Sequence, residues 1–215
     1  MHDLVIDMSK DVLLENRTLA KENSKKMKKF GTEAYEFMGS IGSGKTLIIE
    51  RIIENLKEKG IKCGVIAGDV AGEDDYKRFK KHGIEVVNVN TGKECHLDAH
   101  LISHALNKLN LKNIDILFIE NVGNLVCPVD FPLGAKKRIV VISLTEGDDM
   151  VRKHPIIFAI ANVIIINKID LARVVDVDPN IIIKDIKKIE KNKKIYLTDA
   201  KHEYGIDKLM VGIGL

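Results

Sequence analysis

A phosphate-binding loop most constrains the fold that this chain can adopt. Residues 39–46 have the pattern G-x-x-x-x-G-K-T and run Gly39, Ser40, Ile41, Gly42, Ser43, Gly44, Lys45, Thr46. Glycines in such a loop allow successive backbone N–H groups to surround phosphate oxygens, with Lys45 reaching the β and γ oxygens and the Thr46 hydroxyl binding Mg²⁺. The pattern is specific only between a strand and a helix, which the apolar runs at 34–38 and 47–53 predict.

Short β-rich runs alternate with helical stretches along the rest of the chain. They lie at 35–38, 62–67, 86–89, 115–120, 139–143, 163–167 and 195–198. Nearly continuous Val and Ile runs are typical of parallel strands that are buried on both faces. We therefore expect an α/β fold of the P-loop NTPase type, with a mostly parallel sheet flanked by helices on both faces. Ligands of such sheets bind beyond the carboxyl ends of the strands.

A second motif, Asn167-Lys168-Ile169-Asp170, directly follows the apolar run 163–166 and indicates which base is bound. Asp170 can accept hydrogen bonds from the N1–H and N2 amino groups of guanine, whereas adenine would present an acceptor to this carboxylate. The plain alternative is a capping Asp before a helix, which would matter only if the phosphate loop were missing. The two motifs together predict binding of GTP and GDP.

Acidic residues at two predicted strand ends are suited to the Mg²⁺ of a nucleotide. Asp69 and Asp75 follow one strand, and Glu120 begins the sequence Glu-Asn-Val-Gly that occupies the place of the D-x-x-G signature of GTPases. Carboxylates there, together with Thr46, predict a Mg²⁺ site. Gly123 leaves room for its N–H to approach the γ-phosphate and to sense hydrolysis.

The predicted catalytic groups are Lys45, Asp69, Asp75 and Glu120. No Gln stands at a candidate water-positioning place. Asp69 or Asp75 is therefore the expected group for orienting the attacking water. Asp74 alone is interpreted as a solvent-facing acid early in a helix.

A cluster of soft metal ligands lies between the two acidic segments and just after the second. It comprises Cys95, His96, His100, His104 and Cys127. On a helix the three histidines would advance by about 40° per step and form one stripe. Neutral imidazole and thiolate suit Zn²⁺ and Ni²⁺ rather than Mg²⁺. The alternative for His100 and His104 is that they are boundary histidines on an amphipathic helix.

Composition and length set the domain organisation. With 215 residues, of which 45% are hydrophobic, the chain suffices for one substantial core. A net charge of +3 requires neither nucleic acid nor a membrane as partner, and the apolar runs are far shorter than the ~20 residues of a membrane span. No cleavable signal is visible at the start, and three cysteines fit a reducing compartment, so the cytoplasm is expected.

Within that single core we expect two parts. Residues 1–30 form a basic helical extension with a solvated charged face, because its apolar positions are few. Residues 31–215 form the P-loop GTPase domain, with an inserted metal-binding segment at 95–127.

The combined motifs resemble the hydrogenase nickel-incorporation GTPases, the HypB family. The resemblance runs through residues 38–46, 68–70 with Asp75, 91–100, 118–128, 145–149 and 167–171. It implies a SIMIBI-class GTPase that dimerises with nucleotide and passes nickel toward the large-subunit precursor of [NiFe]-hydrogenase. It also implies a dimer-interface metal site on Cys95, His96 and Cys127, to which His100 and His104 add ligands. A small zinc-containing nickel chaperone of the HypA type is the implied partner.

Three departures from the family's pattern carry expectations. Before residue 30 the only metal-binding side chain of the soft type is His2, which argues against nickel storage. Asp199-Ala200-Lys201 replaces the usual Ser-Ala-Lys base loop; the Ala200 N–H is still expected to reach guanine O6, while the Asp199 carboxylate is expected to weaken binding. The end of the chain, 210–215, contains two glycines and is expected to fray.

Two rival functions remain open at this stage. A urease nickel-insertion GTPase, or another SIMIBI relative of a nickel or cobalt pathway, shares the nucleotide motifs. That urease family has Cys-Pro-His in its metal motif, whereas here Val129 follows Cys127-Pro128. From a different class comes a metal-storage or metal-sensing module with an idle phosphate loop, which a measurement of GTP hydrolysis would separate from the enzyme.

Overall fold

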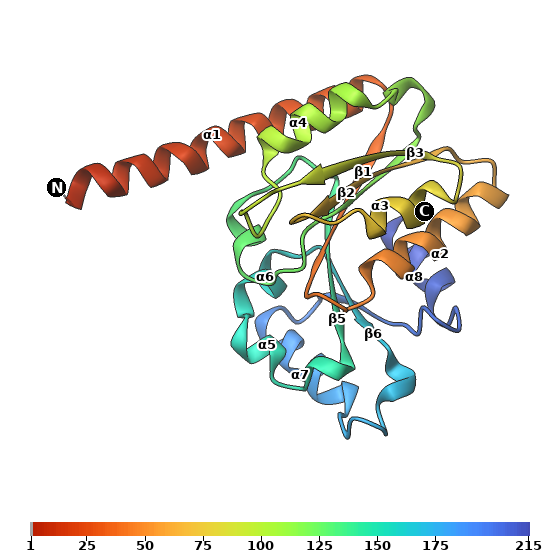
Figure 1. Ribbon diagram of the computed structural model, residues 1–215. Helices are drawn as coiled ribbons and strands as arrows, with labels where there is room; N and C mark the ends of the chain where they lie inside the picture. Colours follow the sequence, from red (N-terminus) through yellow and green to blue (C-terminus); the bar gives the residue numbers. More distant parts are fainter. Residues whose placement is uncertain (1) are drawn as a thin grey trace.

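A single parallel sheet organises the computed structural model, which describes residues 2–215, with side chains from Lys10 onward (Figure 1). Met1, the first residue of the expected extension, lies outside the described residues. Over that described range the sheet has seven strands in the order β3-β2-β4-β1-β5-β6-β7. They are β1 (Glu33–Gly39), β2 (Cys63–Asp69), β3 (Glu85–Asn90), β4 (Ile116–Glu120), β5 (Lys137–Ser143), β6 (Val163–Asn167) and β7 (Lys194–Leu197). Every neighbouring pair is parallel, which confirms the predicted fold class.

Helices cover both faces of the sheet, as predicted. The α-helices are α1 (His2–Lys29), α2 (Lys45–Glu58), α3 (Asp74–Lys80), α4 (Ala99–Lys108), α5 (Met150–Lys153), α6 (Pro155–Ile160), α7 (Pro179–Ile189) and α8 (Ile206–Ile213). Short 3₁₀ turns are η1 (Leu111–Asn113), η2 (Cys127–Asp130), η3 (Leu144–Glu146) and η4 (Ile169–Leu171). Helices α2, α3 and α8 pack on one face, and α1, α4, α6 and α7 pack on the other. Between residues 2 and 215 no helix combines the length and apolarity that crossing a membrane requires.

The side-chain alternation of the strands explains this two-sided arrangement. On β1, Tyr35 and Phe37 join the core under α2 and α8, whereas Ala34 and Met38 face the opposite layer. Alternate residues of a strand point to opposite faces, so a strand that is apolar at every position needs helices on both sides. The continuous run Val163–Asn167 in β6 is buried throughout for the same reason.

Helix α1 is more integrated into the fold than a solvated extension. From Lys10 onward its buried positions are Asn16, Ala20, Asn23 and Met27, whose spacing of four, three and four residues forms one helical stripe. Asn16 accepts a hydrogen bond from Ala99 N (2.7 Å), and Asn23 donates to Ala99 O (2.8 Å). The prediction of a charged face therefore holds for the exposed side only. It overlooked the buried stripe because half of that stripe is polar.

The end of the chain is capped rather than frayed, contrary to expectation. Gly214 adopts a left-handed φ of 86°, which allows Gly214 N and Leu215 N to donate to Met210 O. Gly212 lies where the ring of Tyr196 contacts α8; a Cβ there would be 1.8 Å from the Tyr196 hydroxyl oxygen. Both glycines thus meet specific steric requirements.

We predict that Gly212→Ala destabilises the protein by about 1–3 kcal/mol through overpacking against Tyr196. In a helix interior the same change normally stabilises by up to about 1 kcal/mol, so its sign is diagnostic. Urea denaturation would measure the effect in the wild type and in a Tyr196→Leu background. There the substitution is expected to be neutral or stabilising. Stabilisation in the wild-type background would show that Tyr196 does not restrict position 212.

Candidate functional site

A cavity of about 440 Å³ lies at the carboxyl ends of β1, β2 and β4. It brings together ten of the predicted residues, namely Ile41, Gly42, Gly44, Lys45, Thr46, Asp69, Asp75, Glu120, Gly123 and Lys168. Arg78 and Asn121, which were not predicted, also line it. The strand register explains the convergence, because Glu120 pairs with Phe37 of β1 on one side and Ala67 of β2 on the other.

The phosphate loop has the backbone geometry that its glycines predict. Gly39 has a φ of 147°, and a Cβ there would lie 2.1 Å from Val141 O. Gly44 has a φ of 98° and caps the start of α2. Lys45 Nζ donates to Gly39 O (3.2 Å) and Ser40 O (3.0 Å), which holds the ammonium over the loop. Burial lowers the pKa of Lys45, opposed mainly by Glu120.

Several polar atoms around this cavity lack partners, which tests whether a nucleotide and Mg²⁺ fit. The Thr46 hydroxyl donates to Glu120 Oε1 (2.8 Å). Among the described residues Glu120 Oε2, Ser40 Oγ and Ser43 Oγ are buried without a hydrogen-bond partner. Burial raises the pKa of Glu120 to about 7, against the opposing charge of Lys45. Unsatisfied buried groups of this kind are costly, and a polyphosphate with a divalent cation supplies the partners that they need.

Asn167 is buried and forms hydrogen bonds to both the phosphate loop and the predicted base loop. Its Nδ2 donates to Ser43 O (3.0 Å), while its Oδ1 accepts from Thr198 Oγ1 (3.0 Å) and Ala200 N (3.2 Å). Gly44 must lack a Cβ here, because that atom would lie 2.3 Å from Asn167 Nδ2. Lys168 Nζ donates to Gly42 O (2.7 Å). The structure therefore uses both residues to join the base loops to the phosphate loop.

The base loop, residues 199–201, makes hydrogen bonds within the chain. The Ala200 N–H, which we expect to reach guanine O6, donates to Asn167 Oδ1 in this structure. Asp199 is engaged locally by His202 Nδ1 (2.5 Å) and by the N–H groups of Lys201 and His202. Burial raises the pKa of Asp199, but these hydrogen bonds outweigh it and hold the pKa below its ordinary value. Asp170 is exposed, with a carboxylate oxygen within 4.8 Å of ligand atoms of Asp199 and His202.

Three of the predicted soft ligands converge at a second site. The ligand atoms of Cys95, His96 and Cys127 all lie within 4.8 Å of one another. The two sulfur atoms are 2.9 Å apart, and both residues are free thiols. The hydrogen bond with Cys127 raises the pKa of Cys95. The His96 ring packs on Phe131 with centroids 4.1 Å apart. Thiolates and an imidazole at this spacing form a donor set suited to Zn²⁺ or Ni²⁺.

The predicted three-histidine stripe is wrong. Helix α4 begins at Ala99, because the Asp98 side chain caps it by accepting from Leu101 N (2.7 Å), so His96 precedes the helix. His100 and His104 do share a helical face, with their Nε2 atoms 3.1 Å apart. That pair stands outside the described group of mutually close ligand atoms. A capping Asp three residues before Leu101 was the signal in the sequence that places the helix start.

Asn124 connects the two sites and was missed by sequence reasoning. Its Nδ2 donates to Cys95 O (3.2 Å), and its Oδ1 accepts from Val126 N (2.7 Å) and Cys127 N (3.4 Å). Its backbone also forms an isolated antiparallel bridge with Gly39 at the start of the phosphate loop. One residue therefore touches both cysteine backbones and the nucleotide loop.

Comparisons with known proteins agree with this arrangement. Residues 33–197 match the model of the family described as CobW/HypB/UreG, nucleotide-binding domain. A probable hydrogenase maturation factor HypB of Methanocaldococcus jannaschii is 55% identical over 206 residues, which cover 96% of this chain and 93% of that protein.

Two solved structures share the whole fold. A crystal structure of hydrogenase maturation factor HypB from Archaeoglobus fulgidus superposes with a TM-score of 0.86 at 46% identity, covering 93% of this chain and 97% of the other. HypB from Helicobacter pylori in complex with nickel superposes with a TM-score of 0.87 at 34% identity, covering 93% of each chain. The family match, over residues 33–197, includes both the phosphate loop and the cysteine cluster.

Proposed function

This chain belongs to the CobW/HypB/UreG family, and from that premise we propose that it is a GTP-hydrolysing metallochaperone that delivers nickel during [NiFe]-hydrogenase maturation. In this proposal GTP favours a homodimer, and the metal bound by Cys95, His96 and Cys127 lies at the dimer interface. A HypA-type nickel chaperone supplies the metal, and the hydrogenase large-subunit precursor receives it.

One observation carries the proposal: a single short segment serves both sites. Glu120 ends β4 with an unpartnered buried oxygen at the nucleotide cavity, and Cys127 belongs to the ligand cluster. Between them, Asn124 contacts Cys95 and pairs with Gly39. A change at the γ-phosphate that moves Gly123 must therefore act close to the metal ligands. Such a linkage suits a protein that releases metal when nucleotide is hydrolysed.

The proposed chemistry is in-line attack of water on the γ-phosphate. Thr46 and Glu120, with Asp69 and Asp75 nearby, would hold Mg²⁺, which when bound offsets negative charge on the phosphates. Lys45 stabilises the charge that spreads over the γ-phosphate oxygens in the transition state. Asp69 or Asp75 orients the water.

The metal centre requires deprotonated sulfur. Two thiolates and one imidazole per chain leave coordination incomplete in a tetrahedral site, and a two-fold axis can complete it with the same groups of a second copy. Nickel is cargo in this scheme, whereas Zn²⁺ is a resident alternative for the same donors. Metal and nucleotide then each favour the dimer, and thermodynamic linkage makes that effect reciprocal.

Lys45→Ala is expected to lower Mg²⁺-dependent GTP hydrolysis by at least about 100-fold, because the transferring phosphoryl group loses a preorganised positive charge. Steady-state release of phosphate measures the effect, and circular dichroism checks the fold. Lys112→Ala, on an exposed 3₁₀ turn, is the matched control and should retain full activity. Unaltered turnover in the Lys45 variant would contradict the assigned role. A wild-type chain without GTPase activity would favour the metal-storage alternative.

Asp170→Asn should lower GTP affinity by about 100-fold or more, because the substitution removes the carboxylate that accepts two hydrogen bonds from guanine. The same variant should gain affinity for xanthosine triphosphate, because the amide can donate to the additional carbonyl. Equilibrium titration with both nucleotides measures the exchange. Asp207→Asn, exposed on α8, serves as the control. Unchanged GTP affinity without any gain for the xanthine nucleotide would show that Asp170 does not contact the base.

Cys95→Ala/Cys127→Ala should abolish dimerisation that depends on Zn²⁺ or Ni²⁺ in sedimentation experiments with a GTP analogue. Cys63→Ala, which removes the buried third thiol, is the control and should behave as the wild type. The metal competes with protons for the cysteines, and the pKa of Cys95 is raised, so metal affinity should fall as the pH is lowered. Equal metal affinity of monomer and dimer would rule out a shared site.

A further inference from the structure

A buried carboxylate lies in the centre of the sheet, outside both sites. Glu36 is on β1 and is fully buried; burial raises its pKa, opposed by Arg138 and Asn121. Arg138 of β5 donates from Nε to Glu36 Oε2 (2.9 Å). Well-packed apolar residues in place of such a pair are often no less stable, so stability alone does not account for it.

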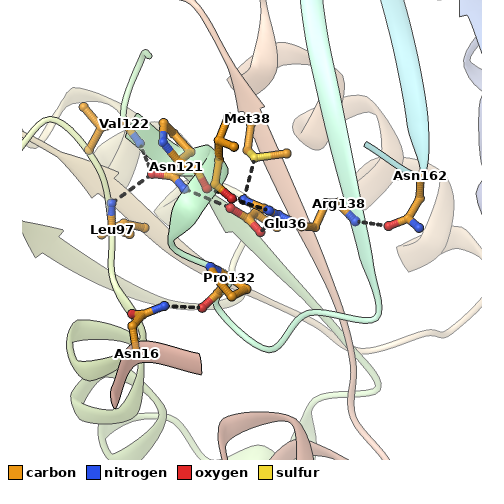
Figure 2. Close-up of polar contacts among 11 residues, drawn as sticks. Asn16, Glu36, Met38, Leu97, Asn121, Val122, Pro132, Arg138 and Asn162 are labelled. Carbon is orange, nitrogen blue, oxygen red and sulfur yellow. Dashed lines mark hydrogen bonds and ion pairs between the residues drawn. The ribbon is translucent and has the colours of Figure 1, made fainter. Parts of the chain in front are cut away.

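Arg138 also holds the segment that follows one of the metal ligands. Its guanidinium donates to Val129 O (3.2 Å) and to Pro128 O, the two carbonyls directly after Cys127. Figure 2 shows the guanidinium of Arg138 directed at Glu36 and Met38. The planar guanidinium fork fixes direction as well as distance. The pose of Arg138, and with it the path of the chain at Cys127, is therefore set by Glu36.

Asn121 holds the segment that contains the other ligands. Its Nδ2 donates to the second oxygen of Glu36 (2.9 Å), and its Oδ1 accepts from Leu97 N (3.0 Å) and Val122 N (2.9 Å). Leu97 directly follows His96, and Val122 directly precedes Gly123. Figure 2 shows the amide of Asn121 directed at Leu97 and Val122 on one side and at Glu36 on the other.

We propose that Glu36, acting through Arg138 and Asn121, is a positioning residue. It sets the separation of the loops that carry His96 and Cys127, and it joins them to the segment 120–123 that approaches the γ-phosphate. The inference rests on the proposed function in taking Cys95, His96 and Cys127 as a metal site. It assigns the two oxygens of one carboxylate to the two loops. Oε2 fixes the Cys127 side through Arg138, and Oε1 fixes the His96 side through Asn121.

The same geometry assigns the direction of coupling. Asn121 belongs by its backbone to the 120–123 segment, so a movement of that segment displaces its side chain. The side-chain oxygen is shared between Val122 N and Leu97 N, so the His96 loop must move with it or lose a buried hydrogen bond. The coupling thus passes through named polar contacts that can be removed singly.

Arg138→Lys separates positioning from charge, because Lys keeps a cation beside Glu36 but lacks the planar fork that reaches Glu36 and both carbonyls at once. In the full chain without nucleotide, Zn²⁺ affinity should fall by about 10–100-fold, the usual effect of losing a partner outside the ligands. The thiolate-to-metal absorption of a Co²⁺-loaded sample should change as well. Affinity for a GTP analogue without metal should remain at the wild-type value. Arg152→Lys, which alters an ion pair between α5 and Asp185 of α7, is the matched control.

A second variant guards against simple unfolding. Glu36→Leu/Arg138→Met replaces the buried pair with apolar residues and should unfold at a denaturant concentration no lower than Arg138→Lys does, yet lose Zn²⁺ affinity to the same degree. In Asn121→Ala the ratio of Zn²⁺ affinities with and without the GTP analogue should approach one.

The outcomes separate this inference from the function on which it rests. Wild-type Zn²⁺ affinity and an unchanged Co²⁺ spectrum in Arg138→Lys would overturn the inference alone. A wild-type chain whose Zn²⁺ and Co²⁺ binding does not depend on Cys95 and Cys127 would overturn the proposed metal site and the inference together. An Asn121→Ala chain that retains the full nucleotide effect on Zn²⁺ affinity would overturn the assigned direction of coupling.

Discussion

The parallel pairing of β4 between β1 and β2 is the constraint on which the rest of the molecule depends. This register places Glu120 directly beside the segment that enters the phosphate loop and beside the end of β2. Because β4 is central, the segment that follows it must leave the sheet over the nucleotide cavity. Strand order therefore brings Cys127, the proposed metal ligand, toward the phosphate loop, and the contacts of Arg138 and Asn124 fix the local path of the chain there.

Much of this arrangement follows from local sequence signals. Apolar runs and their spacing identified all seven strands to within two residues at either end, because a parallel strand buried on both faces is apolar at nearly every position. The phosphate loop and its acidic residues could also be identified from the sequence, because wrapping the backbone around phosphate requires glycines and binding Mg²⁺ requires carboxylates. The start of α4 was misplaced because histidine spacing was weighed above the capping Asp98. The end of α8 was misjudged because the contact of Gly212 with Tyr196 joins segments on different elements.

What the sequence did not reveal is a set of hydrogen bonds from asparagine side chains to distant backbone groups. Asn16, Asn23, Asn121, Asn124 and Asn167 each bind backbone groups of segments far away in the chain. An amide offers a donor and an acceptor at a fixed distance, so it can satisfy two loops at once without introducing charge. Motifs indicated that Asn121 and Asn167 matter, but no pattern could identify their partners, because these are peptide groups that every residue type carries. Glu36 left a visible signal, a lone acid in an apolar strand, but its partners could not be inferred.

Helix α1 illustrates a consequence of these contacts for how the chain is assembled. Asn16 donates to Pro132 O across a separation of 116 residues, and Asn23 reaches Ala99 across 76. This helix therefore lacks a complete docking surface until Pro132, 116 residues after Asn16, has been synthesised. Its stripe must remain solvent-exposed through that interval, and half of the stripe is polar, which lessens the risk of premature association.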